Sequence, residues 1–214
     1  MNICLKSLIS EQFLDKQTNF GCLMAIISPK KSSHIVKLGK TVVPPEILYT
    51  KDNDYGYEEE PHVTIKFGFT TDLQDNDIHN IINEISKYVI RAGGGGATRE
   101  LNDDEVRINT NSVTCENKNK GKLILGANKI SIFENTDYDV VKMDINKCDI
   151  LKTLNQSANK YPHIDTYNEY HPHLTLAYVQ KGKFNKEIKN RNIKLEVECL
   201  KYSGINGSER YYYL

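Results

Sequence analysis

The sequence predicts an α+β fold in which most strands pair antiparallel. Three observations lead to this prediction. Short runs of alternating apolar and polar residues recur along the 214 residues, bounded by prolines, glycines or charged residues. Other segments carry apolar residues at the spacing of an amphipathic helix. One pattern, Pro-His-apolar-Thr-apolar, occurs twice. With 39% hydrophobic residues, residues 1–214 fit one domain, or two small lobes that share a cleft.

The first half of the chain supplies two strands. Residues 21–28 are apolar and are followed by Pro29 and two lysines, which predicts a buried strand. Residues 62–69 alternate apolar and polar side chains, which predicts a half-buried strand. In this strand His62 and Thr64 share the polar face.

Helices are expected in two places in the first half. Residues 43–49 place prolines where a helix could begin. Isoleucines and a valine at helical spacing predict a helix over residues 77–91, capped by Asp75 or Asp77 and ended at Gly93. The glycine run that follows is expected to form an exposed turn or a lid.

The second half repeats these strands and helices. Patterns typical of strands occur at residues 106–114, 123–133, 140–145, 173–179 and 193–200. Cys148, Leu151 and Leu154 form a helical stripe that ends before Pro162. A turn at residues 203–208 and a tyrosine-rich tail predict a final strand.

Charge and cysteine content restrict the classes of ligand and compartment. Lys plus Arg is 28 and Asp plus Glu is 28, so the chain lacks the strong basic field that binding of long duplexes requires. A small ligand or a short single strand fits better. Five scattered cysteines without Cys-x-x-Cys spacing indicate neither a disulfide framework nor a structural zinc site. Charged residues interrupt the N-terminal apolar stretch, so neither a signal peptide nor a membrane segment is expected, and the cytoplasm is the predicted compartment.

The repeated motif is the most informative feature of the sequence. Residues 61–65 read Pro-His-Val-Thr-Ile and residues 172–176 read Pro-His-Leu-Thr-Leu. A single His-x-Thr on a strand is a weak signal, but two copies with matched flanks are a strong one. The alternative is that both copies only begin strands, with histidine at a solvated rim and threonine chosen for its β propensity.

Two histidines and two threonines suit cleavage of a phosphodiester without a metal. Free imidazole titrates near pH ~6.5, so His62 and His173 can act as a general acid and a general base. Thr64 and Thr175 stand two residues further, about 6.5 to 7 Å along the strand, where a hydroxyl can donate to a phosphate oxygen. His171 and His173 form a His-x-His pair that could bind a metal, but no second ligand cluster lies nearby in sequence. We therefore expect neither a metal nor a cofactor.

On these motifs the chain resembles the two-histidine (2H) phosphoesterases. The resemblance implies a bilobal, LigT-like α+β fold, with two pseudo-symmetric and mostly antiparallel sheets flanked by helices around a central cleft. It assigns catalysis to His62, Thr64, His173 and Thr175. The runs GYEEEPHVTIKFGF and EYHPHLTLAYV further resemble the phage branch, which includes anti-CBASS enzymes and 2′-5′ RNA ligase-like proteins. The region 93–119 has no counterpart in that branch.

Four residues outside the catalytic set are candidates for substrate binding. Lys66 is expected on the polar face with His62, where it could neutralise a phosphate. Phe67 and Tyr178 match the aromatic position that often follows each motif of the family. Tyr211 could stack on a nucleobase from the terminal strand, or pack an edge strand.

Three hypotheses for the function follow. The first is a phosphodiesterase that opens cyclic di- or trinucleotide immune signals and so counteracts host CBASS defence. The second keeps the chemistry but acts on short RNA, at 2′,3′-cyclic phosphate ends or 2′-5′ linkages. The third is a nucleotide-binding sponge without catalysis, which would not need a paired acid and base. The sequence does not determine the oligomeric state.

Overall fold

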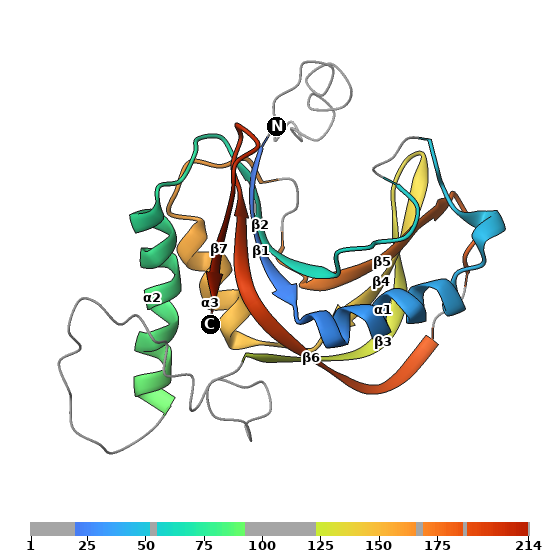
Figure 1. Cartoon of the computed structure of the whole chain (residues 1–214), viewed down its shortest axis with the longest axis horizontal. Helices are drawn as coiled ribbons and strands as arrows, with labels where there is room; N and C mark the ends of the chain where they lie inside the picture. The colour runs from blue at the N-terminus through green and yellow to red at the C-terminus, as the bar shows by residue number, and fades with distance from the viewer. Residues whose placement is uncertain (1–19, 52–54, 93–122, 166–168, 186–187, 214) are drawn as a thin grey trace, which may run out of the picture.

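The computed structural model describes residues 20–51, 55–92, 123–165, 169–185 and 188–213 (Figure 1). The strands in these residues are β1 (Gly21–Ile27), β2 (His62–Phe69), β3 (Ile124–Glu134), β4 (Tyr138–Ile145), β5 (His173–Gln180), β6 (Ile188–Ser203) and β7 (Glu209–Tyr213). The helices are α1 (Pro29–Val42), α2 (Asp75–Ala92) and α3 (Asp149–Ala158), with a 3-10 turn, η2, at Pro45–Ile47. None of the described helices is long and apolar enough to cross a membrane.

The strands form one antiparallel sheet with the order β1-β2-β5-β4-β3-β6-β7, and β6 also pairs with β1. β6 runs through both lobes of the sheet: its residues 188–196 pair with β3 in one lobe, and its residues 197–203 pair with β1 in the other. β2 and β5 join the lobes a second time through one residue pair, Val63 opposite Leu174. The two predicted sheets are therefore halves of one bent sheet, and the α+β class with antiparallel pairing is confirmed.

The helices cover one face of this sheet. α1 packs against β5 in one lobe, α3 packs against β2 in the other, and α2 lies outside α3 (Figure 1). Gly39 of α1 allows close approach, since a Cβ added there would lie 3.2 Å from the carbonyl oxygen of Leu176. Buried side chains from the sheet and all three helices form one continuous core. The motif strands thus have one face toward this core and one face away from it.

Most predicted elements are confirmed, but helix α1 was missed. Pro29 was interpreted as the end of a strand, whereas it occupies the first turn of the helix, where proline is favoured. Ile35 and Gly39 lie along its buried side, and the C-cap residue Val43 is also buried. The helix expected at residues 43–49 is only the short turn η2. The predicted strand at 106–114 and the glycine-rich turn or lid lie outside the described residues.

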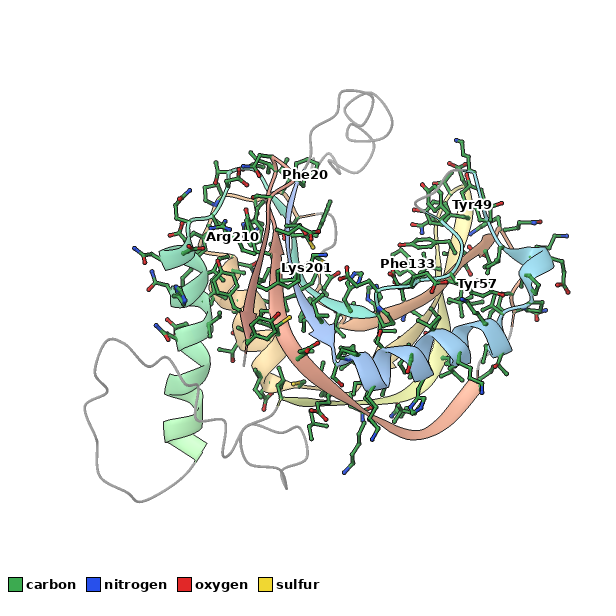
Figure 2. All side chains as sticks on the ribbon, viewed as in Figure 1. Phe20, Tyr49, Tyr57, Phe133, Lys201 and Arg210 are labelled. Carbon is green, nitrogen blue, oxygen red and sulfur yellow. The ribbon has the colours of Figure 1, made fainter. Side chains whose placement is uncertain are left out.

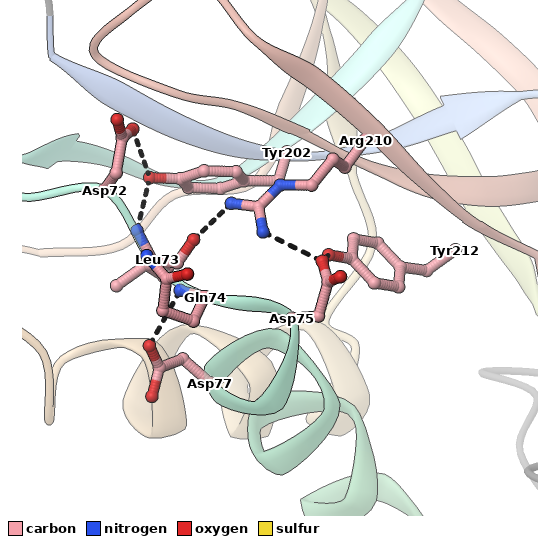
Figure 3. A network of polar contacts seen from close by, with 8 residues as sticks. All are labelled: Asp72, Leu73, Gln74, Asp75, Asp77, Tyr202, Arg210 and Tyr212. Atoms are coloured by element: carbon pink, nitrogen blue, oxygen red, sulfur yellow. Dashed lines mark hydrogen bonds and ion pairs between the residues drawn. The ribbon is translucent and has the colours of Figure 1, made fainter.

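A polar network fastens the start of α2 to the C-terminal strands (Figure 3). The Leu73 N–H donates to the hydroxyl of Tyr202 at 2.9 Å, and both residues are buried. Arg210 donates to the Leu73 carbonyl and, at 2.8 Å, to Asp75 Oδ1. The Asp77 carboxylate accepts the Gln74 N–H at 2.8 Å. These contacts fix α2 against the lobe that contains β2.

Candidate active site

The repeated motif lies where the two lobes meet. Val63 of β2 and Leu174 of β5 are opposite each other, and both are fully buried in the core. Because side chains alternate along a strand, the residues on either side of them point to the other face. Both histidines and both threonines therefore share the face that is turned away from the helices.

We call this surface, defined by His62, Thr64, His173 and Thr175, the histidine face. Antiparallel register places His62 beside Thr175 and Thr64 beside His173, with Cα atoms about 4.5–5.5 Å apart. The two histidines occupy diagonal positions, about 7–8 Å apart. The four residues are thus related by an approximate twofold axis.

Each motif strand carries a β-bulge directly after its threonine. The pairing of β2 with β1 skips Ile65, and the pairing of β5 with β4 skips Leu176. An extra residue reverses the alternation of side chains beyond it. Phe67 and Tyr178 therefore lie on the histidine face, although strict alternation would place them on the core face.

The same bulge overturns the prediction for Lys66. Lys66 was expected on the face of His62 and Thr64, but it pairs with Leu23 and is turned toward the core side. Its side chain is 5% exposed, and its Nζ donates to Asp165 Oδ1 at 2.5 Å. The expectation that Lys66 shares the face of His62 and Thr64 was wrong, because a period of two residues does not reveal a bulge.

Both motif histidines are held in the same orientation. His62 Nδ1 lies 2.8 Å from the Glu60 carbonyl oxygen, and His173 Nδ1 lies 2.9 Å from the His171 carbonyl oxygen. A carbonyl only accepts, so Nδ1 carries the proton in each ring. Each Nε2 can then accept a proton when the ring is neutral and donate one when it is charged.

The surroundings of His173 favour its neutral form. Burial is the main cause that holds the pKa of His173 below its ordinary value of 6.5. Lys142 and His62 lower this pKa further, whereas the His171 carbonyl and Asp144 raise it in part. At neutral pH the Nε2 of His173 is therefore ready to accept a proton.

The strands that flank the motif strands give the histidine face two different borders. β1 places the apolar side chains of Met24 and Ile26 beside the motif of β2. β4 places Lys142 and Asp144 beside the motif of β5. The sequence alone does not reveal this charged pair, because a predicted strand at residues 140–145 does not identify its neighbour in the sheet.

A thiol contacts one of the threonine hydroxyls. Burial raises the pKa of Cys22 to about 12, and a side-chain hydrogen bond with Thr64 offsets this only in part. Cys22 therefore remains a thiol at neutral pH.

The two aromatic candidates next to the motifs belong to different lobes. Phe67 is 44% exposed, and its ring lies edge-on to Phe20 at 5.7 Å. The ring of Tyr178 packs against that of Tyr55 with a centroid distance of 5.3 Å, and the ring of Tyr55 packs against that of Tyr49 with a centroid distance of 4.9 Å. Phe20 and Tyr49 mark these two groups on the two lobes (Figure 2). The structure thus provides one aromatic group on each side of the histidines.

Tyr211 lies on the edge strand β7, away from the motif strands. It pairs with Lys201 of β6, and both β6 and β1 lie between β7 and β2. Its ring lies 5.6 Å from Lys201 Nζ, and its hydroxyl donates to Glu209 at 2.8 Å. Burial lowers the pKa of Lys201 (labelled in Figure 2), but hydrogen bonds to Glu209 and Glu60 outweigh it, so this pKa is raised. Tyr211 is the outermost candidate of the site.

No group of three or more histidine, cysteine, aspartate or glutamate side chains within the described ranges could hold a metal ion. Chemistry without a metal stays a prediction, to be tested by chelation.

Comparison with known proteins identifies the fold. No family model matches the chain, and no curated protein matches it in sequence. Among solved structures, a phosphoesterase crystal structure matches with a TM-score of 0.51 and 13% identity, over 92% of this chain and 95% of that one. Escherichia coli LigT complexed with 3′-AMP matches with the same TM-score, identity and coverage. The chain has the LigT-like fold. The bilobal, LigT-like α+β architecture that the resemblance implied is confirmed as a fold.

Proposed function

We propose that this LigT-like chain is a metal-independent phosphodiesterase that cleaves by acid-base catalysis with His62 and His173. One observation carries the proposal. The register of β2 and β5 brings two histidines and two threonines, far apart in sequence, onto one face with twofold symmetry. A pair of imidazoles across one phosphate provides a base for the attacking oxygen and an acid for the leaving oxygen.

The geometry supports a two-step reaction. His173 Nε2 takes the proton from a ribose 2′-hydroxyl, whose oxygen attacks the phosphorus as the bond to the 5′-oxygen breaks. The 5′-oxygen takes the proton from His62 Nε2, which leaves a 2′,3′-cyclic phosphate and a free 5′-hydroxyl. Thr64 and Thr175 donate to the non-bridging oxygens, where negative charge develops. Water then opens the cyclic phosphate, with the histidines in exchanged roles.

For the substrate, we propose a cyclic di- or trinucleotide immune signal, cleaved to a linear product in the host cytoplasm by a viral anti-CBASS enzyme. The balanced charge supports a small nucleotide over a long nucleic acid. The resemblance of both motif segments to the phage branch supports the immune role. RNA ends with 2′,3′-cyclic phosphates, or 2′-5′ linked RNA, are the alternative substrates for the same site.

The decisive experiment compares ribose and 2′-deoxyribose substrates. Purified protein is incubated with a 3′-5′ cyclic dinucleotide, its 2′-deoxy analogue and an RNA with a 2′,3′-cyclic end, and products are identified by mass spectrometry. We expect the ribose ring to open and the deoxy ring to persist. Equal cleavage of both rings would exclude the neighbouring hydroxyl as nucleophile. Opening of the RNA end alone would assign the protein to RNA processing, and binding without any cleavage would make it a sponge.

A further inference from the structure

The two halves of the histidine face differ in charge although their motifs match. Met24 and Ile26 are each 9% exposed and border the motif of β2. On the other side, Lys142 lies opposite Thr175 and Asp144 lies opposite His173. A phosphate between the two motifs therefore meets an apolar border on β1 and an ammonium group on β4.

Lys142 is held by two neighbours. Its Nζ donates to Asp144 Oδ1 and, at 3.0 Å, to Ser131 Oγ of β3. Ser131 Oγ in turn donates to the second carboxylate oxygen of Asp144 at 2.8 Å. An ammonium group has three donors, and these contacts use two of them. The Lys142 side chain is only 13% exposed, so its position is restricted.

We propose that Lys142 binds the scissile phosphate beside Thr175, and that Asp144 and Ser131 are positioning residues that aim its ammonium group. The proposal rests on the proposed phosphodiesterase function and adds the charged group that recognises the substrate. A phosphodiester carries one negative charge, and its pentacoordinate state concentrates more charge on the non-bridging oxygens. Two threonine hydroxyls supply hydrogen bonds but no positive charge.

Other buried lysines do not fit this role. Lys66 is turned to the core side and is bound to Asp165. Lys201 lies on the histidine face, but β1 separates its strand from β2. It also binds Glu60 and Glu209, so its positive charge is outnumbered by two carboxylates. Lys142, by contrast, lies directly opposite Thr175 on the neighbouring strand, and neighbouring strands are about 4.8 Å apart.

The first test measures binding of a phosphate group separately from turnover. Adenosine 3′-monophosphate and adenosine are titrated into wild-type protein, Lys142→Met and Lys142→Arg by calorimetry. Lys142→Met should weaken binding of the monophosphate on the order of 10²-fold and leave adenosine unaffected, because charge-assisted contacts are the strong ones. Lys142→Arg should retain most of the affinity. Lys181→Met, which breaks a lysine-carboxylate pair with Asp139 at the far end of β5, should bind both as wild type does.

The second test separates charge recognition from a structural role of the pair. Asp144→Asn keeps a side-chain oxygen that accepts from the Lys142 ammonium group, so the group stays aimed, and it removes a negative charge near the phosphate. This variant should therefore bind the monophosphate at least as well as wild type. Lys142→Met with Asp144→Asn leaves no unpaired charge, and it should fold but bind poorly. Four groups bear on His173 in this part of the site, namely Lys142, Asp144, His62 and the His171 carbonyl. The acid limb of the kcat/KM profile should move to higher pH in Lys142→Met and to lower pH in Asp144→Asn.

The outcomes distinguish this inference from the proposed function. If wild type cleaves phosphodiesters and Lys142→Met does so with unchanged kcat and KM, the inference is wrong and the function stands. If wild type cleaves nothing but Lys142→Met loses affinity for the monophosphate alone, the proposed function is wrong, and Lys142 is a phosphate-binding residue of a site that does not cleave. Equal affinity of all variants for the monophosphate, or no binding by wild type, overturns the inference.

Discussion

Substitution of Gly68 by alanine tests how the end of β2 is held. Gly68 has φ +97°, in the region that favours glycine, and lies in the irregular pairing between Phe67 and Phe69. A Cβ added here would lie 2.2 Å from the carbonyl oxygen of Ile164, which is backbone and cannot turn away. The Ile164 N–H donates to the Gly68 carbonyl at 2.9 Å, so the two backbones are paired at this point.

The expected loss of folding stability in Gly68→Ala has two parts, and alanine at a second glycine, Gly207, measures one of them alone. At Gly207, with φ +79° and nothing within 4 Å of an added Cβ, alanine carries only the conformational cost. That cost is about 1–2 kcal/mol. At Gly68 the same cost applies, and separation of the backbones also removes the hydrogen bond to Ile164, which contributes about 1 kcal/mol. Gly68→Ala should therefore destabilise the protein by at least about 1 kcal/mol more than Gly207→Ala does.

Urea denaturation of both variants measures this difference. The midpoint should fall in Gly207→Ala and fall further in Gly68→Ala, with the dependence on urea unchanged. Equal midpoints in the two variants would show that the contact between Gly68 and Ile164 does not restrain the strand.

Three further predictions concern the polar network at the start of α2, the core-facing Lys66 of β2 and the pH dependence of kcat/KM. Tyr202→Phe leaves the buried Leu73 N–H without its acceptor and should lower the free energy of unfolding, measured in urea, by about 1–3 kcal/mol. In Tyr212→Phe the lost hydroxyl bonds an exposed carboxylate, so the decrease should be less than ~1 kcal/mol. Equal decreases would show that the hydrogen bond from Leu73 to Tyr202 does not stabilise the protein. Lys66→Met should keep the wild-type kcat and KM for a phosphodiester, because Lys66 is buried against Asp165. A higher KM or a lower kcat in the folded variant would show that Lys66 belongs to the site. The pKa of His173 in the folded protein is lowered, so this base stays deprotonated at pH values somewhat below 6.5. We therefore expect kcat/KM to fall only when the pH falls through that lowered pKa. An acid limb above pH 6.5 would remove His173 as the base. The same shift destabilises the folded state as pH falls from 6.5 through the folded pKa, because the unfolded chain then binds more protons.

The sequence identified the motif strands because their pattern is local. Proline, histidine and alternating apolar residues are enough to predict that His62 and His173 begin strands and share a face with Thr64 and Thr175. The pairing of these strands with each other, through Val63 and Leu174, depends on the whole topology. It could be expected only from the resemblance to a known family.

Other features of the site depend on departures from regular structure or on distant pairing. The bulges after Thr64 and Thr175 turn Lys66 away from the histidine face and bring Phe67 onto it, and alternation alone predicts the reverse for Lys66. Lys142 gives no signal in sequence, since a lysine on the polar side of a strand is usually solvated. Its position follows from the register of β4 with β5.

The central claim is that His62 and His173 together cleave a phosphodiester without a metal. The most direct measurement is the rate of phosphodiester cleavage in EDTA by wild type, His62→Ala and His173→Ala, with His171→Ala as the matched control. His171 is exposed, and alanine there keeps the backbone carbonyl that orients His173. We predict that wild type and His171→Ala are active in EDTA, and that each motif variant remains folded and loses activity by about 10²–10⁴-fold. Loss of wild-type activity in EDTA with rescue by Mn²⁺ or Zn²⁺, or a wild-type rate in either motif variant, would contradict the account.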